Sequence, residues 1–73
     1  MNNKHDRFVA LAEKRVLRAI REIRLVGNLA NSHNYEYSHE EAQRVTSTLE
    51  QEVKLLKARF ASSLTRGNPT FKL

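Results

Sequence analysis

Residues 9–30 read VALAEKRVLRAIREIRLVGNLA, and the order of apolar and charged residues in this stretch decides the fold. Because an α-helix turns by about 100° per residue, positions separated alternately by three and four residues fall on one side of it. Apolar or small residues occupy these positions: Val9, Ala12, Val16, Ala19, Ile23, Val26 and Ala30. The opposite side carries Arg7, Lys14, Arg18 and Arg21. The stretch predicts an amphipathic helix with a packing side and a cationic side.

A second apolar stripe lies in the other half of the chain. It follows the 3.6-residue period of a helix and consists of Ala42, Val45, Leu49, Val53, Leu56 and Phe60. Immediately before it, Ser38-His39-Glu40-Glu41 has the pattern of a capping box, with Ser38 as the N-cap and Glu41 at the third helical position. The sequence therefore predicts a second helix that starts at this point.

The boundaries of the two helices follow from caps and breakers. We expect the first helix over about 4–28, a polar loop over about 29–37, the second helix over about 38–62 and a flexible tail over about 63–73. Asn3 or Asp6 can cap the first helix. The sequence leaves two alternatives for the end of this helix. Gly27 and Asn28 can adopt the left-handed conformation of a C-cap, whereas Ala30 continues the stripe and would extend the helix to Asn31.

Two helices joined by a short loop predict an all-α fold, an antiparallel helical hairpin that forms one domain over residues 1–73. A chain of 73 residues without cysteine has neither a large core nor disulfides to stabilise it. Further apolar residues such as Leu17, Leu25 and Leu55 lie outside the main stripes and would be exposed on a monomer. We therefore expect a homodimer that forms a four-helix bundle. Its candidate core and dimer residues are Val9, Val16, Ile20, Ile23, Leu49, Val53, Leu56 and Phe60.

The formal net charge of +5 is concentrated in the first helix. Residues 1–31 hold seven Lys or Arg against three acidic residues, whereas residues 39–62 hold four of each sign. The candidate nucleic-acid-binding residues are Arg7, Lys14, Arg15, Arg18, Arg21 and Arg24, which could follow a phosphate backbone. The same residues could instead form a solvated helix face, or contact a membrane surface or an acidic protein.

Two tyrosines in the loop are a weaker candidate for contacts with bases. Tyr35 and Tyr37 lie near Asn31, His33 and Asn34, and aromatic rings beside amides can stack on and hydrogen-bond to unpaired bases. The alternative is that both rings pack over the last core layer at the end of the hairpin.

No pattern indicates catalysis or metal binding. His5, His33 and His39 are not spaced to place two imidazoles on one helix face, and Ser62 and Ser63 have no orienting partner. We expect no enzymatic activity, no cofactor and no metal. No apolar run approaches the length of a transmembrane helix and no signal peptide is evident, so we expect a cytoplasmic protein without a membrane partner.

The predicted layout resembles that of the Rop family of plasmid regulators, and Ala58-Arg59-Phe60 is a local sequence similarity near the end of the second helix. The resemblance implies that a bundle of this size can bind RNA through a helix face; it assigns no residue roles. We expect a small regulatory protein that binds RNA or DNA through the basic face of the first helix. The alternative is a protein–protein interaction adaptor or inhibitor, an accessory protein of phage or plasmid type.

Overall fold

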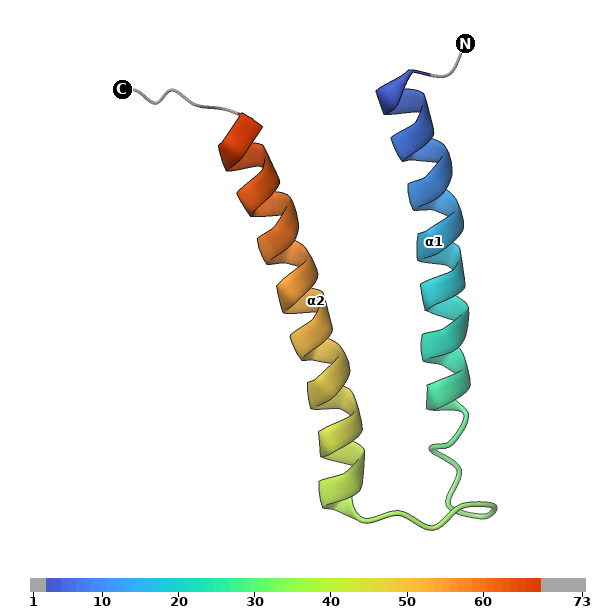
Figure 1. The fold of residues 1–73 in the computed structure, drawn as a ribbon. Coiled ribbons are helices and arrows are strands. Elements are labelled where there is room, and N and C mark those ends of the chain that lie inside the picture. The colour runs from blue at the N-terminus through green and yellow to red at the C-terminus, as the bar shows by residue number, and fades with distance from the viewer. Residues whose placement is uncertain (1–2, 68–73) are drawn as a thin grey trace. The chain divides into compact units, whose positions relative to one another are not determined.

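The computed structural model describes residues 3–67 and contains two α-helices within that range (Figure 1). Helix α1 spans Lys4–Gly27 and helix α2 spans His39–Gly67. No strand is present among the described residues, which confirms the all-α fold class. The chain divides into two structural units, one up to Glu36 and one from Tyr37 onward, and each contains one helix.

Helix α1 begins with a side-chain cap. The backbone N–H of Asp6 donates a hydrogen bond of 2.7 Å to Oδ1 of Asn3, whose backbone is extended. Asn3 is thus the N-cap, and Asp6 lies in the first turn, where its negative charge is favourable at the positive end of the helix dipole. Arg24 in the last turn complements the negative end.

The other end of α1 differs from both sequence-based expectations. No described residue has a positive φ, and Asn28 is right-handed with φ −64° and ψ −18°. The chain leaves the helix through two tight turns, in which Leu29 N–H donates to the Val26 carbonyl and Ala30 N–H to the Gly27 carbonyl, each at 3.0 Å. Such three-residue turns satisfy terminal carbonyls without a left-handed residue. Neither alternative that the sequence left open is realised, because no left-handed cap forms and Ala30 lies outside the helix.

The linker between the helices contains one closed turn around Asn31. The side-chain Oδ1 of Asn31 accepts a hydrogen bond of 3.1 Å from His33 N–H. Its backbone carbonyl accepts two more, from Asn34 N–H at 3.1 Å and Tyr35 N–H at 2.9 Å. Asparagine favours such turns because its short side chain can bond to the backbone two residues ahead. Hydrogen bonds within residues 31–35 therefore define the conformation of this part of the linker.

The capping box at the start of α2 is confirmed. Glu41 N–H donates to Oγ of Ser38 at 3.0 Å, and Ser38 N–H donates to Oε1 of Glu41 at 2.8 Å. Glu40 and Glu41 both lie in the first turn, where acidic side chains are favourable. The reciprocal bonds satisfy two backbone donors that the helix itself cannot pair.

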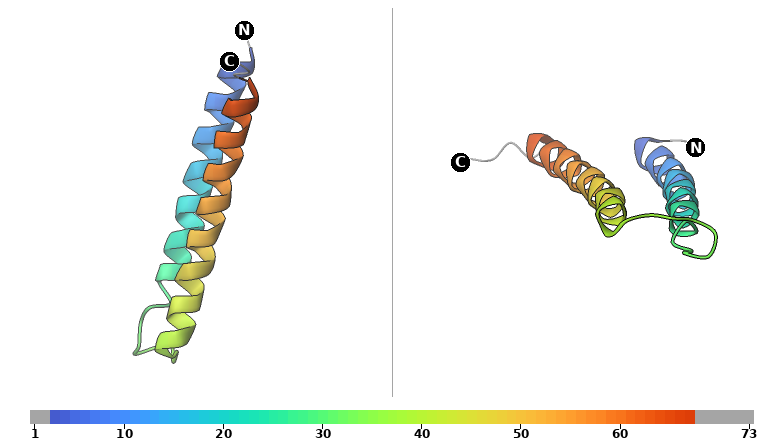
Figure 2. Two further views of the ribbon diagram at one scale, coloured as in Figure 1. Left: turned by 90° about the vertical axis from the view of Figure 1, so that its left-hand side faces the viewer. Right: turned by 90° about the horizontal axis from the view of Figure 1, so that it is seen from below.

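Helix α2 continues to Gly67 rather than ending near residue 62, and the views in Figure 2 show it without a break. Ser62, Ser63 and Thr65 are weak helix formers, but each costs only about 0.5 kcal/mol relative to alanine. These residues lower helix propensity without ending the helix. The remainder of the expected tail, residues 68–73, lies outside the described residues.

Neither helix buries its own apolar stripe. Among residues 3–63, whose side chains are described, none is buried, and Ala12, Ala42 and Leu49 alone are partly buried. Ile23 in the α1 stripe is 49% exposed, and Leu56 in the α2 stripe is 52% exposed. Within each of the two structural units, the described apolar side of the helix therefore remains exposed.

Replacing Ser38 with alanine should lower the stability of α2 by about 1 kcal/mol, because the N–H of Glu41 loses its side-chain acceptor. Thermal unfolding followed by far-UV circular dichroism measures the change. Ser47→Ala is the matched control, since Ser47 is exposed within the helix and alanine has the higher helix propensity. Equal loss in both variants would show that the cap contributes nothing.

Replacing Gly27 with alanine should stabilise α1 by about 0.5–1 kcal/mol. Gly27 does not have a positive φ, and a Cβ placed on it meets no atom within 4 Å. Alanine therefore fits the native backbone and reduces the conformational freedom of the unfolded chain. The midpoint of thermal unfolding should rise; a lower midpoint would indicate that this residue needs the left-handed conformation.

Candidate nucleic-acid interface

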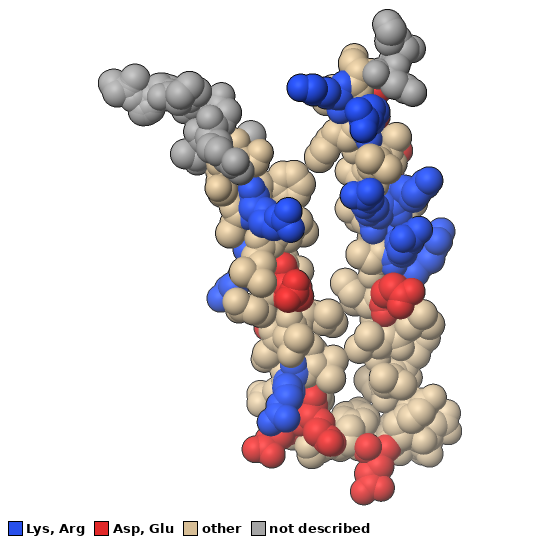
Figure 3. All heavy atoms as spheres, in the orientation of Figure 1, with Lys and Arg blue, Asp and Glu red and all other residues tan. Residues whose placement is uncertain are grey.

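Four cations lie along one side of α1, and we call them the α1 cationic face: Arg7, Lys14, Arg18 and Arg21. At about 100° per residue they fall within an arc of about 60°, and Arg15 and Arg24 flank this arc on its two sides. All six side chains are exposed. In Figure 3, Lys and Arg atoms gather over the part of α1 nearer its N-terminus. The structure thus places the predicted cations on one continuous, accessible helix surface.

Cations on α1 are neighbours of one another rather than of carboxylates. Residues three or four apart are adjacent on a helix surface, and this spacing joins Lys14 to Arg18, Arg18 to Arg21 and Arg21 to Arg24. Each like-charge pair destabilises an isolated helix by about 0.2–0.5 kcal/mol. The one acidic residue at such a spacing from a cation is Glu22, which is four residues after Arg18. The charge arrangement therefore works against the stability of α1.

The charges of α2 are arranged in the opposite way. Glu40 precedes Arg44 by four residues, and Glu50 precedes Lys54 by four. An acidic residue four positions before a basic one is the favourable orientation for an intrahelical pair. Lys54 and Lys57 are the one like-charge pair three or four residues apart in the part of α2 whose side chains are described. Helix α2 thus balances its own charges, whereas α1 does not.

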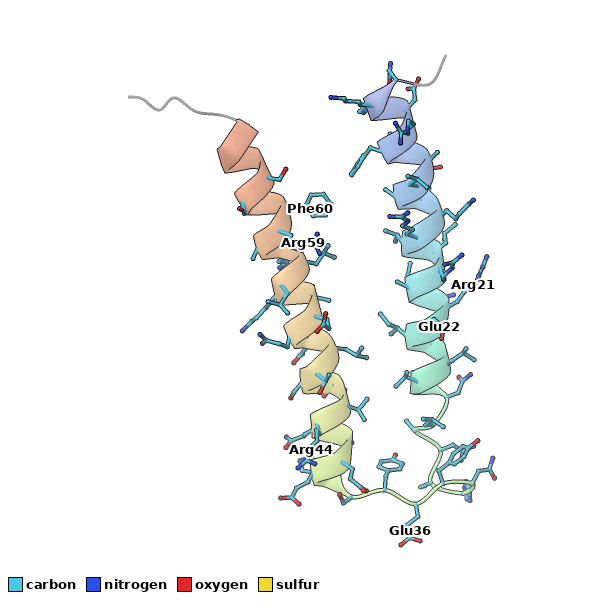
Figure 4. The ribbon with its side chains drawn as sticks, in the orientation of Figure 1. Arg21, Glu22, Glu36, Arg44, Arg59 and Phe60 are labelled. Carbon is cyan, nitrogen blue, oxygen red and sulfur yellow. The ribbon has the colours of Figure 1, made fainter. Side chains whose placement is uncertain are left out.

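The labelled side chains in Figure 4 illustrate this difference. Arg21 extends outward from α1, while Arg44 lies at the start of α2, on the first turns that carry Glu40 and Glu41. Glu36 projects from the linker. The excess positive charge of the described chain is therefore presented by α1.

Two leucines also lie on the cationic side of α1, which the charge pattern alone does not suggest. Leu11 and Leu25 fall within about 20° of the arc occupied by the four cations, and they are 41% and 58% exposed. Both leucines lie outside the 3,4-spaced stripe, so the cationic side also carries exposed apolar surface. Neither helix, within the described residues, is long and apolar enough to cross a membrane.

Helix α1 lacks the amide and hydroxyl side chains with which proteins contact bases other than guanine. Between Lys4 and Gly27 there is no Asn, Gln, Ser or Thr. Amide side chains read adenine through paired hydrogen bonds, whereas Arg and Lys contact both phosphates and guanine. The composition of α1 therefore suits contacts with a phosphate backbone better than readout of a sequence.

The loop tyrosines are exposed but are placed in different surroundings. Tyr35 is 50% exposed and closes the turn around Asn31 through its backbone N–H. Tyr37 is 44% exposed and directly precedes the N-cap Ser38 of α2. A large apolar residue at that position commonly packs against the fourth helical residue, here the partly buried Ala42. A capping role thus accounts for Tyr37, and Tyr35 has the freer ring.

Other chemistry has little support in the described residues. No group of three His, Asp or Glu side chains there could hold a metal ion. A shallow surface hollow on α2 is lined by Glu52, Leu55, Leu56, Ala58, Arg59 and Ser62. These residues come from consecutive turns of one helix, and the hydroxyl of Ser62 is ten residues from the carboxylate of Glu52, about 15 Å along the helix axis, too far for the carboxylate to act as its base.

Comparison of the chain with protein-family models, with curated proteins and with solved structures gave no match.

Replacing Arg21 with glutamine should stabilise α1 by about 0.3 kcal/mol at low salt, because it removes repulsion from Arg18 and Arg24. Arginine and glutamine have similar helix propensities, so charge is the main difference. Helix content from circular dichroism, measured at low and high salt, tests this. Arg44→Gln is the control and should have the opposite effect, because it removes the pairs with Glu40 and Glu41. A loss of helix in Arg21→Gln would contradict the repulsion.

Proposed function

We propose that this protein is a small non-enzymatic protein that binds nucleic acid through the α1 cationic face. The observation that carries the proposal is the run of exposed like-charged neighbours Lys14, Arg18, Arg21 and Arg24. Repulsion within such a run lowers the stability of the free helix, and an anion that neutralises the charges removes this repulsion. A surface whose only requirement is solubility would be served equally well by the balanced charges found on α2.

A polyanion with closely spaced charges fits this surface best. Along the helix axis Lys14 and Arg18 are about 6 Å apart, and Arg18 and Arg21 about 4.5 Å. Double-stranded DNA carries one charge per about 3.4 Å of axis on each strand, so neighbouring cations can reach phosphates of the same strand. Arginine also contacts phosphate through two parallel hydrogen bonds. The face therefore suits a phosphate backbone.

Binding of this kind depends weakly on base sequence. The absence of Asn and Gln from α1 removes the usual means of reading adenine, and Arg can read only guanine by paired hydrogen bonds. We therefore expect RNA and DNA of different sequences to bind with similar affinities, and the affinity to fall steeply with salt.

The alternative is an adaptor or inhibitor that binds another protein. The exposed apolar stripes of α1 and α2 favour it, because apolar patches of this kind mark interaction surfaces. The alternative accounts for the apolar side of α1 but gives no reason for its uncompensated charge. Nucleic-acid binding accounts for the charge.

The double substitution Arg18→Glu with Arg21→Glu should abolish binding, because two attractive contacts with phosphate become repulsive. Fluorescence anisotropy with labelled duplex RNA and duplex DNA of about 20 base pairs measures the affinity. If four phosphates are neutralised, the logarithm of the wild-type binding constant should fall with the logarithm of salt concentration with a slope of about −3.6.

Lys54→Glu with Lys57→Glu is the matched control, because it changes the net charge equally and has the same spacing on α2. The control should retain most of the affinity. Equal loss in both double variants would show that net charge, not the α1 cationic face, is responsible. If wild type binds neither nucleic acid at low salt, the proposal fails; binding to vesicles with anionic lipid would then indicate a membrane surface.

A further inference from the structure

The apolar side of α1 has the repeat of a two-stranded coiled coil. We call its helical members the α1 seam: Val9, Ala12, Val16, Ala19, Ile23 and Val26. Their spacing alternates strictly between three and four residues within Lys4–Gly27, which is the heptad repeat. Val9, Val16 and Ile23 take one of its two core positions, and Ala12, Ala19 and Val26 take the other. All except the partly buried Ala12 are exposed.

Helix α2 does not continue such a repeat. After Ala42, Val45 and Leu49, the next three heptad positions hold Glu52, Leu56 and Arg59. Two of these three residues are charged, and the apolar residues lie instead at Val53 and Phe60. A charged residue in a two-stranded seam would be buried without a partner, which is costly. The helix that matches the full length of the α1 seam is therefore another α1.

We propose that the α1 seam binds α1 of a second copy of this chain in antiparallel orientation. In the proposed register, the two-fold axis that relates the two helices passes between Leu17 and Arg18. Val16 then lies beside the partner's Ala19, and Ala12 lies beside the partner's Ile23. Each of these layers combines a small residue with a larger one, which is how helices fill the space between them without voids.

Charge complementarity supports the antiparallel orientation. In this register Arg15 and the partner's Glu22 flank the seam on the same side, and the two-fold axis repeats the pair. Both side chains are exposed in the single chain. If the same seam residues packed in a parallel, in-register dimer, Arg15 would lie beside the partner's Ile20, and Ala12 would lie beside the partner's Ala12. That orientation would form no flanking ion pair and would leave gaps at the alanine layers.

Charge reversal at the two flanking positions tests the register. Arg15→Glu and Glu22→Arg should each weaken self-association about tenfold, because both copies of the attractive pair become repulsive. The variant with both substitutions should regain affinity. A mixture of the two single variants should form a heterodimer in preference to either homodimer, since both flanking pairs are then attractive. Sedimentation equilibrium gives the association constants, starting from the 8.5 kDa mass of one chain, and circular dichroism confirms that each variant remains helical.

Disulfide trapping gives an independent measurement, because the chain contains no cysteine. Ala12→Cys and Ile23→Cys chains are mixed and allowed to oxidise. The antiparallel register brings these two positions together, so the expected product is the mixed disulfide. A cysteine at residue 12 would be about 16 Å along the axis from the same position of the partner, too far for a disulfide.

Three results would overturn the proposal. These are a monomer at high micromolar concentration, disulfides only between identical positions, or single charge reversals that leave association unchanged. None of these measurements involves nucleic acid, so this proposal can fail while the proposed function holds, and the reverse is also possible.

Discussion

The constraint on which the whole structure depends is that the apolar side of α1 must be removed from water. Most of the stability of a helix in a protein comes from packing of its apolar side, and the 24 residues of α1 form such an amphipathic helix. Helix α1 has a cap at Asn3, but its cationic neighbours oppose helix formation, and its seam residues are mostly exposed in the single chain. Burial of the seam is the favourable contribution that is large enough to compensate. Each fully buried Val or Ile side chain contributes about 1.5–3 kcal/mol, several times the cost of one like-charge pair.

The two proposals assign the two sides of α1 to different partners. The α1 seam would face a second copy, and the α1 cationic face lies on the opposite side of the same helix. In an antiparallel pair the two cationic faces would therefore point in opposite directions. Such a dimer would have two separate binding surfaces, each able to hold one nucleic-acid segment. It would act by holding two segments together, rather than by enlarging a single patch.

Local features of the fold were predictable from sequence because they depend on residues close together in the chain. The capping box of Ser38 and Glu41 needs four residues, and the structure contains both of its hydrogen bonds. The exact ends of the helices were not predictable. Gly27 permits a left-handed cap but does not require one, and the chain instead forms two tight turns after it. Near the end of α2, residues such as Ser62 lower helix propensity without stopping the helix.

The candidate site was predictable only in part. Six of the seven cations of α1 were named from sequence, and the continuous helix leaves all six exposed, with Arg15 and Arg24 at the margins of the α1 cationic face. Leu25 was expected to be exposed outside the apolar stripe, whereas Leu11 was not singled out. The ligand of the face could not be predicted, since positive charge attracts any polyanion and the residues of α1 include none of the amides that would select a base.

Repulsion within the α1 cationic face also links binding to stability. A phosphate backbone that neutralises Lys14, Arg18 and Arg21 would remove the unfavourable like-charge contacts at the same time as it forms new ones. The helix would then be more stable in the complex than when free, because a ligand that binds only the folded state stabilises that state. Since the seam forms only when α1 is helical, the same ligand would favour association of two chains. Nucleic-acid binding and dimerisation would thus support each other through the stability of one helix, although they use opposite sides of it.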